Sequence, residues 1–476
     1  MSAVTGIGVY TPRWRIEAAA FEEAWGRQDA AGVSQKAVPG PDEDALTMAV
    51  EAGRRALSAA DRSGSDIDWL ALASANLPVA EEDLTARVGA MLAIPEACQR
   101  RTVTGSTRAG TQALRDGATS VAEGRSCALV LVGDAPVGET HDGVDHAAGA
   151  GAAAFVIEPD GPLAVTDSAE YATVAPGVRF RERGADRTTG LGITQYDRTV
   201  FLEALGGALE GLEEPVDPDA VAVQSPDGKL PYRASALSGV DVDTIQAAAV
   251  VHQLGDLGAA SVPVAIASAI RDGHTSVLGL GYGGGVGADA LVLEGEGAPV
   301  SGRLEGSATV TYSEYLRLRG EVTGDLPDGG GAYVSMPTWR RSIPQRYRLE
   351  AGRCHACGEL AFPPEGACPD CGRLEGYEPT PLPGTGTVRA VTTISQGGAP
   401  PEFAPYQDRV GSFPAAIVAF DGPDECDTVS VPVMVTDADA EDVTVDTAVA
   451  GRIRRLYTQE GVTRYGLKVV VRPDQV

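Results

Sequence analysis

The sequence predicts an α/β body built from two similar halves, followed by a four-cysteine metal site and a small all-β barrel. Three observations lead to this prediction: a weak internal repeat in the first ~300 residues, two Cys-x-x-Cys pairs near residue 360, and a change to β-type runs after residue 382. Short apolar runs that alternate with helical segments are typical of α/β units on a largely buried sheet. At 476 residues the chain is long enough for two or three buried cores.

The internal repeat consists of two pairs of segments, each pair about 150 residues apart. Segments 65–73 and 216–223 share Asp-x-Asp followed by an apolar run, and segments 124–133 and 273–281 share a glycine followed by an apolar run that ends in glycine. Helical segments rich in small residues precede the second pair: 109–122 and 259–270. A duplicated α/β layered fold would produce such halves, although chance similarity stays open because Gly, Ala and Asp are common in this chain.

The composition of the chain changes after residue 290. Segment 324–331 is rich in Gly, Asp and Pro and is typical of a linker. Segment 336–349 carries one Trp and four Arg, and it predicts a short docking helix or an extended arm. Further on, apolar runs separated by Gly, Pro and Asp turns predict a small barrel. These runs are 384–394, 415–419, 428–435 and 465–471.

Acidic residues give the chain a net charge of −28, and they are spread along its whole length. Lysine occurs only at Lys36, Lys229 and Lys468, so arginine supplies nearly all of the positive charge. An acidic, lysine-poor surface stays hydrated where salt screens charge, which favours a salt-rich cytoplasm; an acidic mesophilic protein is the alternative. Such a charge disfavours general binding to nucleic acid, whose phosphates need Lys and Arg.

No membrane span or export signal is expected from this sequence. No stretch reaches the ~18 uninterrupted apolar residues of a spanning helix. Residues 1–11 show no basic region followed by an apolar core. We therefore expect a cytoplasmic protein.

Four of the seven cysteines are clustered: Cys354, Cys357, Cys368 and Cys371. They form two Cys-x-x-Cys knuckles, each of which places two thiolates on one tight turn. Two such knuckles complete a closed tetrahedral site, which suits a structural zinc ion rather than Lewis-acid catalysis. Unpaired or redox-active cysteines are the alternative interpretation.

The first ~320 residues resemble archaeal hydroxymethylglutaryl-CoA synthases. The resemblance is carried by VTGIGVYTPRWRI (4–16), KAVPGPDED (36–44) running on to Met48, PDGKLP (226–231) and YGGGVGADA (282–290). It implies the duplicated αβαβα fold of the thiolase superfamily, which agrees with the internal repeat. It also implies a CoA thioester as ligand and a body that forms a dimer across its sheet.

Residues ~336–476 resemble the zinc-ribbon/OB-fold family that accompanies acyl-CoA condensing enzymes. The matching pieces are the arginine-rich arm, the two knuckles, Phe-Pro-Pro at 362–364 and GTGTV at 384–388. In archaea, separate members of that family bridge thiolase and hydroxymethylglutaryl-CoA synthase and share the pantetheine site, so a thiolase is an implied partner beside a homodimer. The implied domains are a thiolase-like domain (1–322), a linker and docking arm (323–349), a zinc ribbon (350–377) and an OB-fold (378–476).

The residues that perform condensation in the family are replaced in this sequence. Thiolase-type condensation needs a cysteine, because a thiolate both attacks and leaves a thioester readily. The place of the family cysteine is occupied by Thr107, and the place of the family histidine by Gln224. Asp256 stands where the family has asparagine, and Ala75 where it has the glutamate acid/base. Four replacements together predict a lost condensing activity.

Other side chains of the sequence could in principle replace the missing groups. Ser106 and Thr107 lie at an expected helix start, where a hydroxyl usually caps the helix, although it could also act as a nucleophile. His252 lies close to Asp256 in sequence and could be a base, but a structural role is the preferred interpretation. His141 and His146 flank acidic residues and are less favoured still.

Two further observations concern sulfur and CoA. Cys98 and Cys127 do not fall at the nucleophile's place and are expected to be buried, small apolar residues. Lys229 lies in the loop where the family has a lysine near CoA, and its ammonium suits a phosphate group. A solvent-exposed lysine without a ligand is the equally weighted alternative.

The sequence therefore predicts a CoA-thioester-binding protein that has lost the condensing residues and serves as a scaffold or a substrate-channelling partner in acyl-CoA metabolism. The alternative is an active acyl-CoA condensing acyltransferase of the hydroxymethylglutaryl-CoA synthase type, with a non-cysteine nucleophile such as Ser106. A purely structural subunit that binds no CoA is the third possibility.

Overall fold

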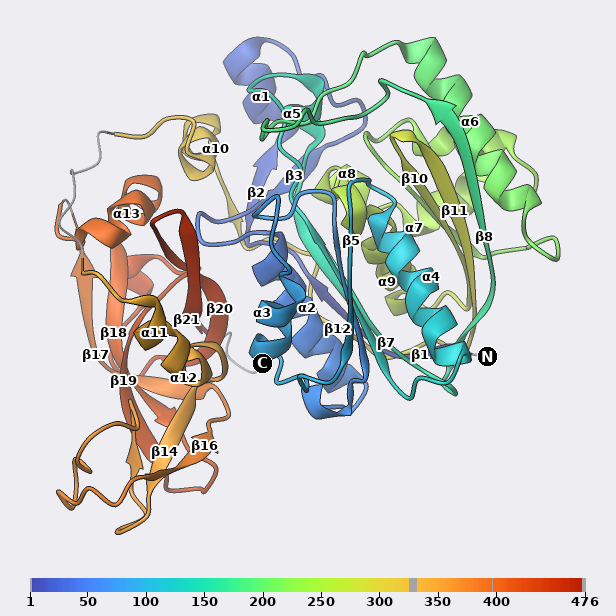
Figure 1. Cartoon of the computed structure of the whole chain (residues 1–476). Coiled ribbons are helices and arrows are strands. Elements are labelled where there is room, and N and C mark those ends of the chain that lie inside the picture. Colours follow the sequence, from blue (N-terminus) through green and yellow to red (C-terminus); the bar gives the residue numbers. More distant parts are fainter. Residues whose placement is uncertain (1, 325–331, 396, 473–476) are drawn as a thin grey trace. The chain divides into compact units, whose positions relative to one another are not determined.

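The computed structural model describes residues 2–324, 332–395 and 397–472. It divides into two compact units (Figure 1). The first comprises Met1–Pro39 and Glu43–Tyr315, and the second comprises Gly40–Asp42 and Leu316–Val476. Most of the predicted linker 324–331 lies outside the described residues. No helix in the described part of the chain is long and apolar enough to cross a membrane.

A single large sheet forms the centre of the first unit. Its order is β5 (Gln99–Thr104), β4 (Trp69–Ser74), β6 (Ala128–Asp134), β7 (Gly151–Glu158), β1 (Ser2–Tyr10), β8 (Leu163–Ala175), β11 (Gly285–Gly295), β10 (Ser276–Gly283) and β9 (Ala220–Val223), and β12 (Val300–Ser301) pairs with β1. The order β4-β6-β7-β1 is mirrored by β9-β10-β11-β8. In both halves the outer pair is parallel and the next pair antiparallel. This symmetry confirms the duplicated α/β fold.

Two buried helices, α4 (Ala109–Ala122) and α9 (Ser261–Arg271), lie in the main hydrophobic core with β1, β4, β6 and β7. They are the small-residue helical segments expected from the repeat. Small side chains allow a close approach: a Cβ atom on Gly110 would lie 2.2 Å from the carbonyl oxygen of Ala259. Glycine at position 110 therefore lets α4 reach η3 (Gly258–Ala260). Two longer helices, α2 (Ala45–Ala59) and α6 (Thr194–Glu210), cover other parts of the sheet.

Shorter elements complete the first unit. The helices are α1 (Ala18–Trp25), α3 (Thr85–Met91), α5 (Gly143–Ala147), α7 (Val242–Ala248), α8 (Val251–Leu254) and α10 (Tyr312–Arg319), which runs into the second unit. The short 3-10 turns are η1 (Gly64–Asp66) and η2 (Pro231–Ala236). A small sheet has the order β13 (Ala308–Thr309), β2 (Trp14–Glu17) and β3 (Gln35–Val38).

The second unit begins with two short helices, a ribbon and a five-stranded sheet. The arm predicted at 336–349 folds as α11 (Met336–Arg341) and α12 (Ile343–Arg348). The ribbon order is β15 (Leu360–Ala361), β14 (Glu350–Cys354) and β16 (Tyr377–Pro381). The five-stranded order is β19 (Thr428–Met434), β18 (Phe413–Asp421), β17 (Thr385–Ile394), β20 (Ala448–Gln459) and β21 (Val462–Val471), with η4 (Pro401–Phe403), α13 (Ala404–Val410) and η5 (Ala440–Asp442) in its connections.

The five-stranded antiparallel sheet is nearly closed. A parallel bridge joins Val435, just after β19, to Val469 in β21, so the two ends of the sheet meet. Val388, Val418 and Val449 fill its interior and are fully buried. The predicted β-type region is confirmed as a barrel-like sheet, but strand β20 was not among the predicted runs.

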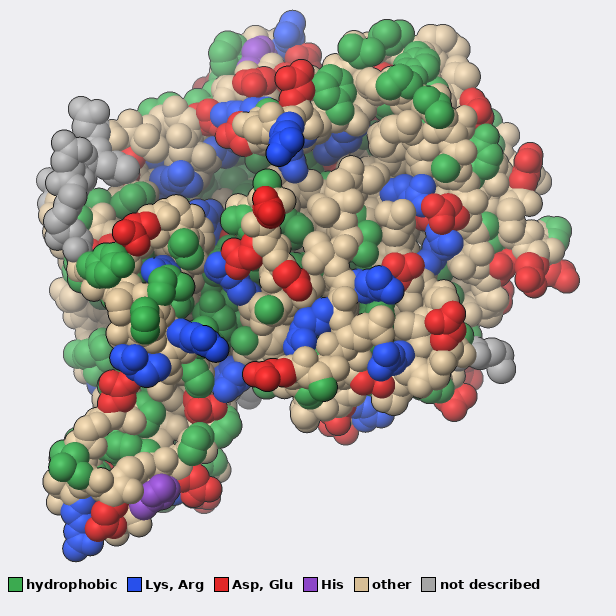
Figure 2. All heavy atoms as spheres, in the orientation of Figure 1, with side chains coloured by type: hydrophobic (Ala, Val, Ile, Leu, Met, Phe, Trp, Pro, Cys, Tyr) green, Lys and Arg blue, Asp and Glu red, His purple; other side chains and the backbone are tan. Residues whose placement is uncertain are grey.

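Two of the three lysines are buried, each with an acidic partner. Lys36 is 1% exposed and donates to the carbonyl oxygen of Asp145 and to the Tyr315 hydroxyl, the latter at 2.9 Å. Lys468 is fully buried and donates to the Asp42 carboxylate at 2.9 Å. Lys229 is exposed. Arginine therefore supplies nearly all of the basic surface that is interspersed with acidic side chains in Figure 2.

Candidate functional site

A cavity of about 760 Å³ in the first unit brings together four of the residues singled out in the sequence: Thr107, Gln224, Lys229 and Asp256. Thr107 lies two residues before α4, in the first half of the repeat. Gln224 follows β9 directly, Asp256 lies just after α8, and Lys229 lies in the loop between β9 and η2. The duplicated fold therefore gathers residues from both halves around one space.

The hydroxyl of Thr107 is committed to a backbone hydrogen bond. It donates to the carbonyl oxygen of Tyr282 at 2.7 Å, and the residue is 6% exposed. Helix α4 begins at Ala109 after the N-cap residue Arg108, with no side-chain cap. The expectation that Thr107 caps this helix is therefore wrong, because its hydroxyl bonds to the neighbouring strand β10 instead. Ser106 makes one long contact at the helix start, to the backbone N–H of Arg108.

Gln224 is a buried amide with one end free. Its Nε2 donates to the carbonyl oxygen of Gly258 at 2.9 Å, whereas its Oε1 has no hydrogen-bond partner among the described residues. The Tyr282 hydroxyl on the same cavity also has none. Burial raises the pKa of Tyr282, so its phenol stays protonated at neutral pH. An amide neither accepts nor releases a proton at neutral pH, so Gln224 cannot replace a histidine in proton transfer.

Asp256 is held by an ion pair. Its Oδ2 lies 2.6 Å from Nη1 of Arg179, and its Oδ1 accepts from the backbone N–H of Gly258 at 2.8 Å. The carboxylate is 1% exposed, and the arginine side chain 19%. Arg179 comes from the loop after β8, and this pairing was not foreseen from the sequence. Both oxygens of Asp256 are thus engaged, which suits a fixed counter-ion better than a mobile base.

Ala75 and Ser106 do not lie on the cavity wall. The backbone N–H of Ala75 donates to Asp134 Oδ2 at 2.9 Å, and the same oxygen accepts from Ala259 at 2.8 Å. Asp134 is fully buried, and burial raises its pKa. The Asp134 carboxylate therefore links a loop of the first half to a loop of the second. It was not predicted from the sequence, where its position at the end of an apolar run was the one available signal. Ser106 Oγ accepts from the backbone N–H of Arg108 at 3.4 Å.

The histidines considered as bases have structural partners. His252 Nε2 lies 2.7 Å from the Tyr232 hydroxyl, and its Nδ1 lies 2.6 Å from the carbonyl oxygen of Gly32. His146 Nδ1 accepts from the backbone N–H of Asp29, and its Nε2 lies 3.0 Å from Nδ1 of His141. Burial lowers the pKa of His146, which favours the neutral ring. None of these rings lines the cavity.

The free cysteines of the first unit, Cys98 and Cys127, do not line the cavity either. Burial raises the pKa of Cys127 to about 12, and it raises the pKa of Cys98 as well. Both are therefore thiols at neutral pH, and thiols are poor nucleophiles. Among the described residues that line the cavity there is neither a cysteine nor a histidine. No side chain there is equipped for thiolate attack or for imidazole proton transfer.

The wall of the cavity carries charges of both signs. Lys229 is exposed, and its backbone N–H donates to Asp227 Oδ1 at 2.6 Å. The basic residues on the wall are Arg179, Arg198, Lys229 and Arg233, and the acidic ones are Asp29, Asp142, Asp197, Asp227 and Asp256. Lys229 is the one exposed lysine of the three, and it lies on the cavity wall.

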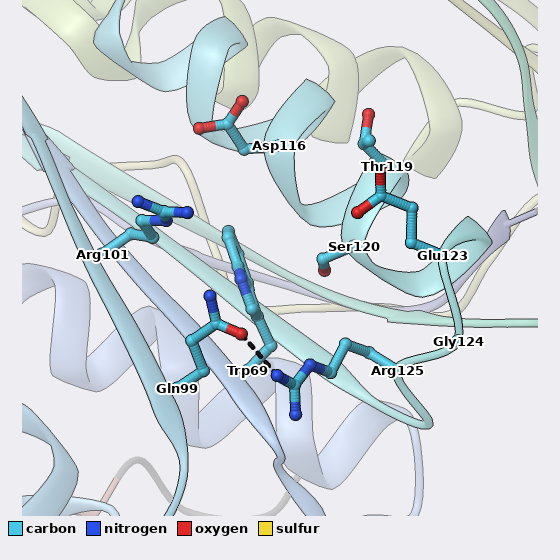
Figure 3. Close-up of a pocket in the computed structure, with 9 residues that line it drawn as sticks. All are labelled: Trp69, Gln99, Arg101, Asp116, Thr119, Ser120, Glu123, Gly124 and Arg125. Carbon is cyan, nitrogen blue, oxygen red and sulfur yellow. Dashed lines mark hydrogen bonds between the residues drawn. The ribbon is translucent and has the colours of Figure 1, made fainter.

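A second pocket of about 470 Å³ lies beside the edge strand β5 (Figure 3). Figure 3 shows Trp69 in the middle of the residues that line it, with Arg101 and Asp116 on one side and Thr119 and Glu123 on the other. Gln99 Oε1 accepts from Arg125 at 2.5 Å across its lower edge. None of the residues singled out from the sequence lies here, and its wall holds no nucleophile paired with a base. It is a polar hollow without the features of a catalytic centre.

The four clustered cysteines form a metal centre in the second unit. The Sγ atoms of Cys354 and Cys371 are 3.8 Å apart, those of Cys357 and Cys368 are 3.6 Å apart, and all four lie within 4.8 Å of one another. Sulfur atoms at the corners of a regular zinc tetrahedron are about 3.8 Å apart, given a Zn–S bond of about 2.3 Å. Backbone N–H groups, chiefly that of Cys357, lower the pKa of Cys354 to about 7. The site fits a structural zinc ion.

The sequence of the zinc-binding segment matches a family described as the ChsH2, rubredoxin-like zinc ribbon domain, over residues 341–375. The larger part of the chain is similar to hydroxymethylglutaryl-CoA synthases. It is 26% identical over 344 residues to that of Methanosphaera stadtmanae, an alignment that covers 68% of this chain and 99% of the relative. It is 28% identical over 346 residues to that of Archaeoglobus fulgidus, with 68% and 99% covered.

Solved structures share the fold at low identity. MvaS in complex with 3-hydroxy-3-methylglutaryl coenzyme A superposes with a TM-score of 0.58 at 18% identity, covering 70% of this chain and 94% of the other. The 3-oxoacyl-[acyl-carrier-protein] synthase III of Aquifex aeolicus superposes with a TM-score of 0.55 at 18% identity, covering 62% and 100%. The chain therefore joins a thiolase-like body, similar to hydroxymethylglutaryl-CoA synthases, to a C-terminal rubredoxin-like zinc ribbon domain and a barrel-like sheet.

Proposed function

We propose that this protein binds a CoA thioester in the 760 Å³ cavity and does not carry out cysteine-dependent condensation. In acyl-CoA metabolism it would serve as a scaffold or a substrate-channelling partner. The observation that carries the proposal is the chemistry of the cavity wall: a threonine, a glutamine and an ion-paired aspartate converge at Thr107, Gln224 and Asp256, where condensation would require a thiolate and a proton acceptor.

Ligand binding is supported by the cavity itself. Its volume lies within the range of small-molecule sites. Buried polar atoms on its wall, such as Oε1 of Gln224, lack partners among the described residues. Lys229, an exposed residue of the wall, offers a charge suited to a phosphate. Of the similar structures named above, that of MvaS contains 3-hydroxy-3-methylglutaryl coenzyme A.

The competing function is an active acyltransferase that uses a hydroxyl nucleophile. Thr107 is the better placed of the two hydroxyls, because it lines the cavity and Ser106 does not. Its proton, however, is donated to a backbone carbonyl, and no imidazole lines the cavity within the described residues. An unactivated hydroxyl is a weak nucleophile toward a thioester. This function therefore lacks the group that would activate it.

The experiment that separates these functions measures binding and covalent labelling on the same preparation. Full-length protein is titrated with CoA and acetyl-CoA by calorimetry, then incubated with radiolabelled acetyl-CoA, denatured and counted. We expect reversible binding without covalent label. Label that disappears in Thr107→Ala or Ser106→Ala would establish the acyltransferase, and the absence of any CoA binding would leave a structural subunit.

We further propose the finer organisation of the chain. The domain limits would be 1–322, 323–349, 350–377 and 378–476. The barrel-like sheet would be an OB-fold, which its strand connectivity and parallel closing bridge support. The body would form a homodimer or associate with a thiolase, and its acidic surface would suit a salt-rich archaeal cytoplasm.

A further inference from the structure

The second unit contains a cavity of its own, with a volume of about 350 Å³. It lies among α11, α12 and the strands β19, β20 and β21. Most of its wall is apolar, formed by Leu349, Phe362, Val431, Val433, Leu456 and Leu467. An apolar cavity of this size in contact with a few polar groups is typical of a small-molecule site.

The polar side of this cavity is formed by Arg346. Its Nε donates to Ser342 Oγ at 2.8 Å, and its guanidinium lies over the ring of Trp339, 4.1 Å from the centroid. Among the described residues, no carboxylate forms an ion pair with Arg346, and this includes Glu365, the acidic residue on the same wall. Burial lowers the pKa of Arg346, which reflects a cost for holding the charge there.

A second arginine without an acidic partner adds to this positive charge. Arg464 is 2% exposed and lies over Trp339 at 5.1 Å. One of its donors points at the sulfur of Met336, and its Nε has no partner among the described residues. Two partly or wholly buried guanidinium groups in one cluster are unfavourable unless an anion compensates them. In a chain with a net charge of −28, a cluster that lacks acidic partners is conspicuous.

We propose that this cavity binds an amphipathic carboxylate, with its alkyl chain among the apolar side chains and its carboxylate on Arg346. The planar fork of a guanidinium matches the two oxygens of a carboxylate, and its stacking on Trp339 fixes that fork in place. Contact with Val433, Leu456 and Leu467 would bury the alkyl chain away from water, which favours binding. This site lies in the other unit and does not depend on the proposed CoA site.

The test titrates the full-length protein with sodium octanoate, octan-1-ol and octanoyl-CoA by calorimetry. Octanoate is expected to bind at one site per chain and octan-1-ol at least tenfold more weakly, because the alcohol lacks the charge that Arg346 requires. Arg346→Gln should weaken octanoate binding about tenfold or more. The matched control Arg389→Gln, on an exposed position of β17, should leave binding within about twofold.

A second variant keeps the proposal testable if Arg346→Gln unfolds. Val433→Phe retains the arginine and fills the cavity, so octanoate binding should be lost while thermal stability is maintained. The proposal is overturned if octanoate does not saturate a site at millimolar concentration. It is equally overturned if Arg346→Gln and Val433→Phe both bind octanoate normally, or if octanoyl-CoA binds in an Arg346-dependent manner while octanoate does not.

Discussion

The ion pair between Arg179 and Asp256 should contribute measurably to the stability of the first unit. Removing one partner from a buried ion pair costs about 3–5 kcal/mol, because the other charge is left uncompensated. The Arg179 side chain is 19% exposed and Asp256 1%, so solvent screens part of the pair, and we expect about 2–3 kcal/mol for Arg179→Met. At roughly 2–4 °C per kcal/mol for a large domain, the melting temperature should fall by about 5–10 °C.

A double-mutant cycle isolates the pair itself. Asp256→Asn keeps an oxygen for the Gly258 N–H and leaves the partly exposed Arg179 to water, so it should cost only about 1 kcal/mol. The double variant should be more stable than the sum of the two losses predicts, by about 1 kcal/mol or more. Arg183→Met, an exposed residue of the same loop, is the control. Calorimetric melting of all four variants is the assay, and an Arg179→Met midpoint within about 2 °C of the wild type would refute the reasoning.

Three further predictions concern the metal centre, the helix contact and the surface charge. Cys368→Ser should reduce the bound zinc, measured by elemental analysis, from one ion per chain to a trace. Cys426 is exposed and lies outside the cluster, so Cys426→Ser should keep its zinc. Equal zinc in both variants would show that the four thiolates are not the ligands. Gly110→Ala places a Cβ against the Ala259 carbonyl and should lower the free energy of unfolding by about 1–3 kcal/mol, measured by chemical denaturation. The control Gly143→Ala, which has open space around its Cβ, should be nearly neutral. Similar losses of stability in both variants would contradict the close packing of α4. The melting temperature should rise as KCl is increased from about 0.1 M to 1 M, because the Debye length falls from about 10 Å to 3 Å and self-repulsion of the −28 charge is screened; a falling midpoint would argue against that cause.

Local patterns in the sequence predicted much of the fold. The apolar runs that begin at residues 69, 128, 220 and 277 are β4, β6, β9 and β10, because fully buried strands are continuously apolar. The cysteine knuckles predicted the ribbon, since ligand spacing alone brings the thiolates together. Strand β20 was missed because Arg452, Arg454 and Arg455 interrupt its apolar pattern, although Arg454 is buried and paired with Asp437.

The details of the cavity could not be predicted, because they depend on contacts between distant segments. Thr107 looked like a helix cap, but its hydroxyl finds the carbonyl of Tyr282, 175 residues away. Asp256 looked like an isolated replacement, but Arg179 arrives from a loop 77 residues earlier. The spacing of residues in the sequence determines which side chains are neighbours within one helix or strand. Hydrogen-bond partners from distant segments depend instead on how the strands are ordered and paired in the sheet.

The central claim is that the cavity of the first unit receives a CoA thioester at a position where the nucleophile is absent. It is tested most directly by introducing a thiol at residue 107 and comparing intact masses after incubation with acetyl-CoA. Thr107→Cys should gain one acetyl group, faster at higher pH because the thiolate reacts, while the wild type and Thr107→Ser should gain none. An acetyl adduct on the wild-type protein, or an unmodified Thr107→Cys protein that fails to bind acetyl-CoA, would contradict the account.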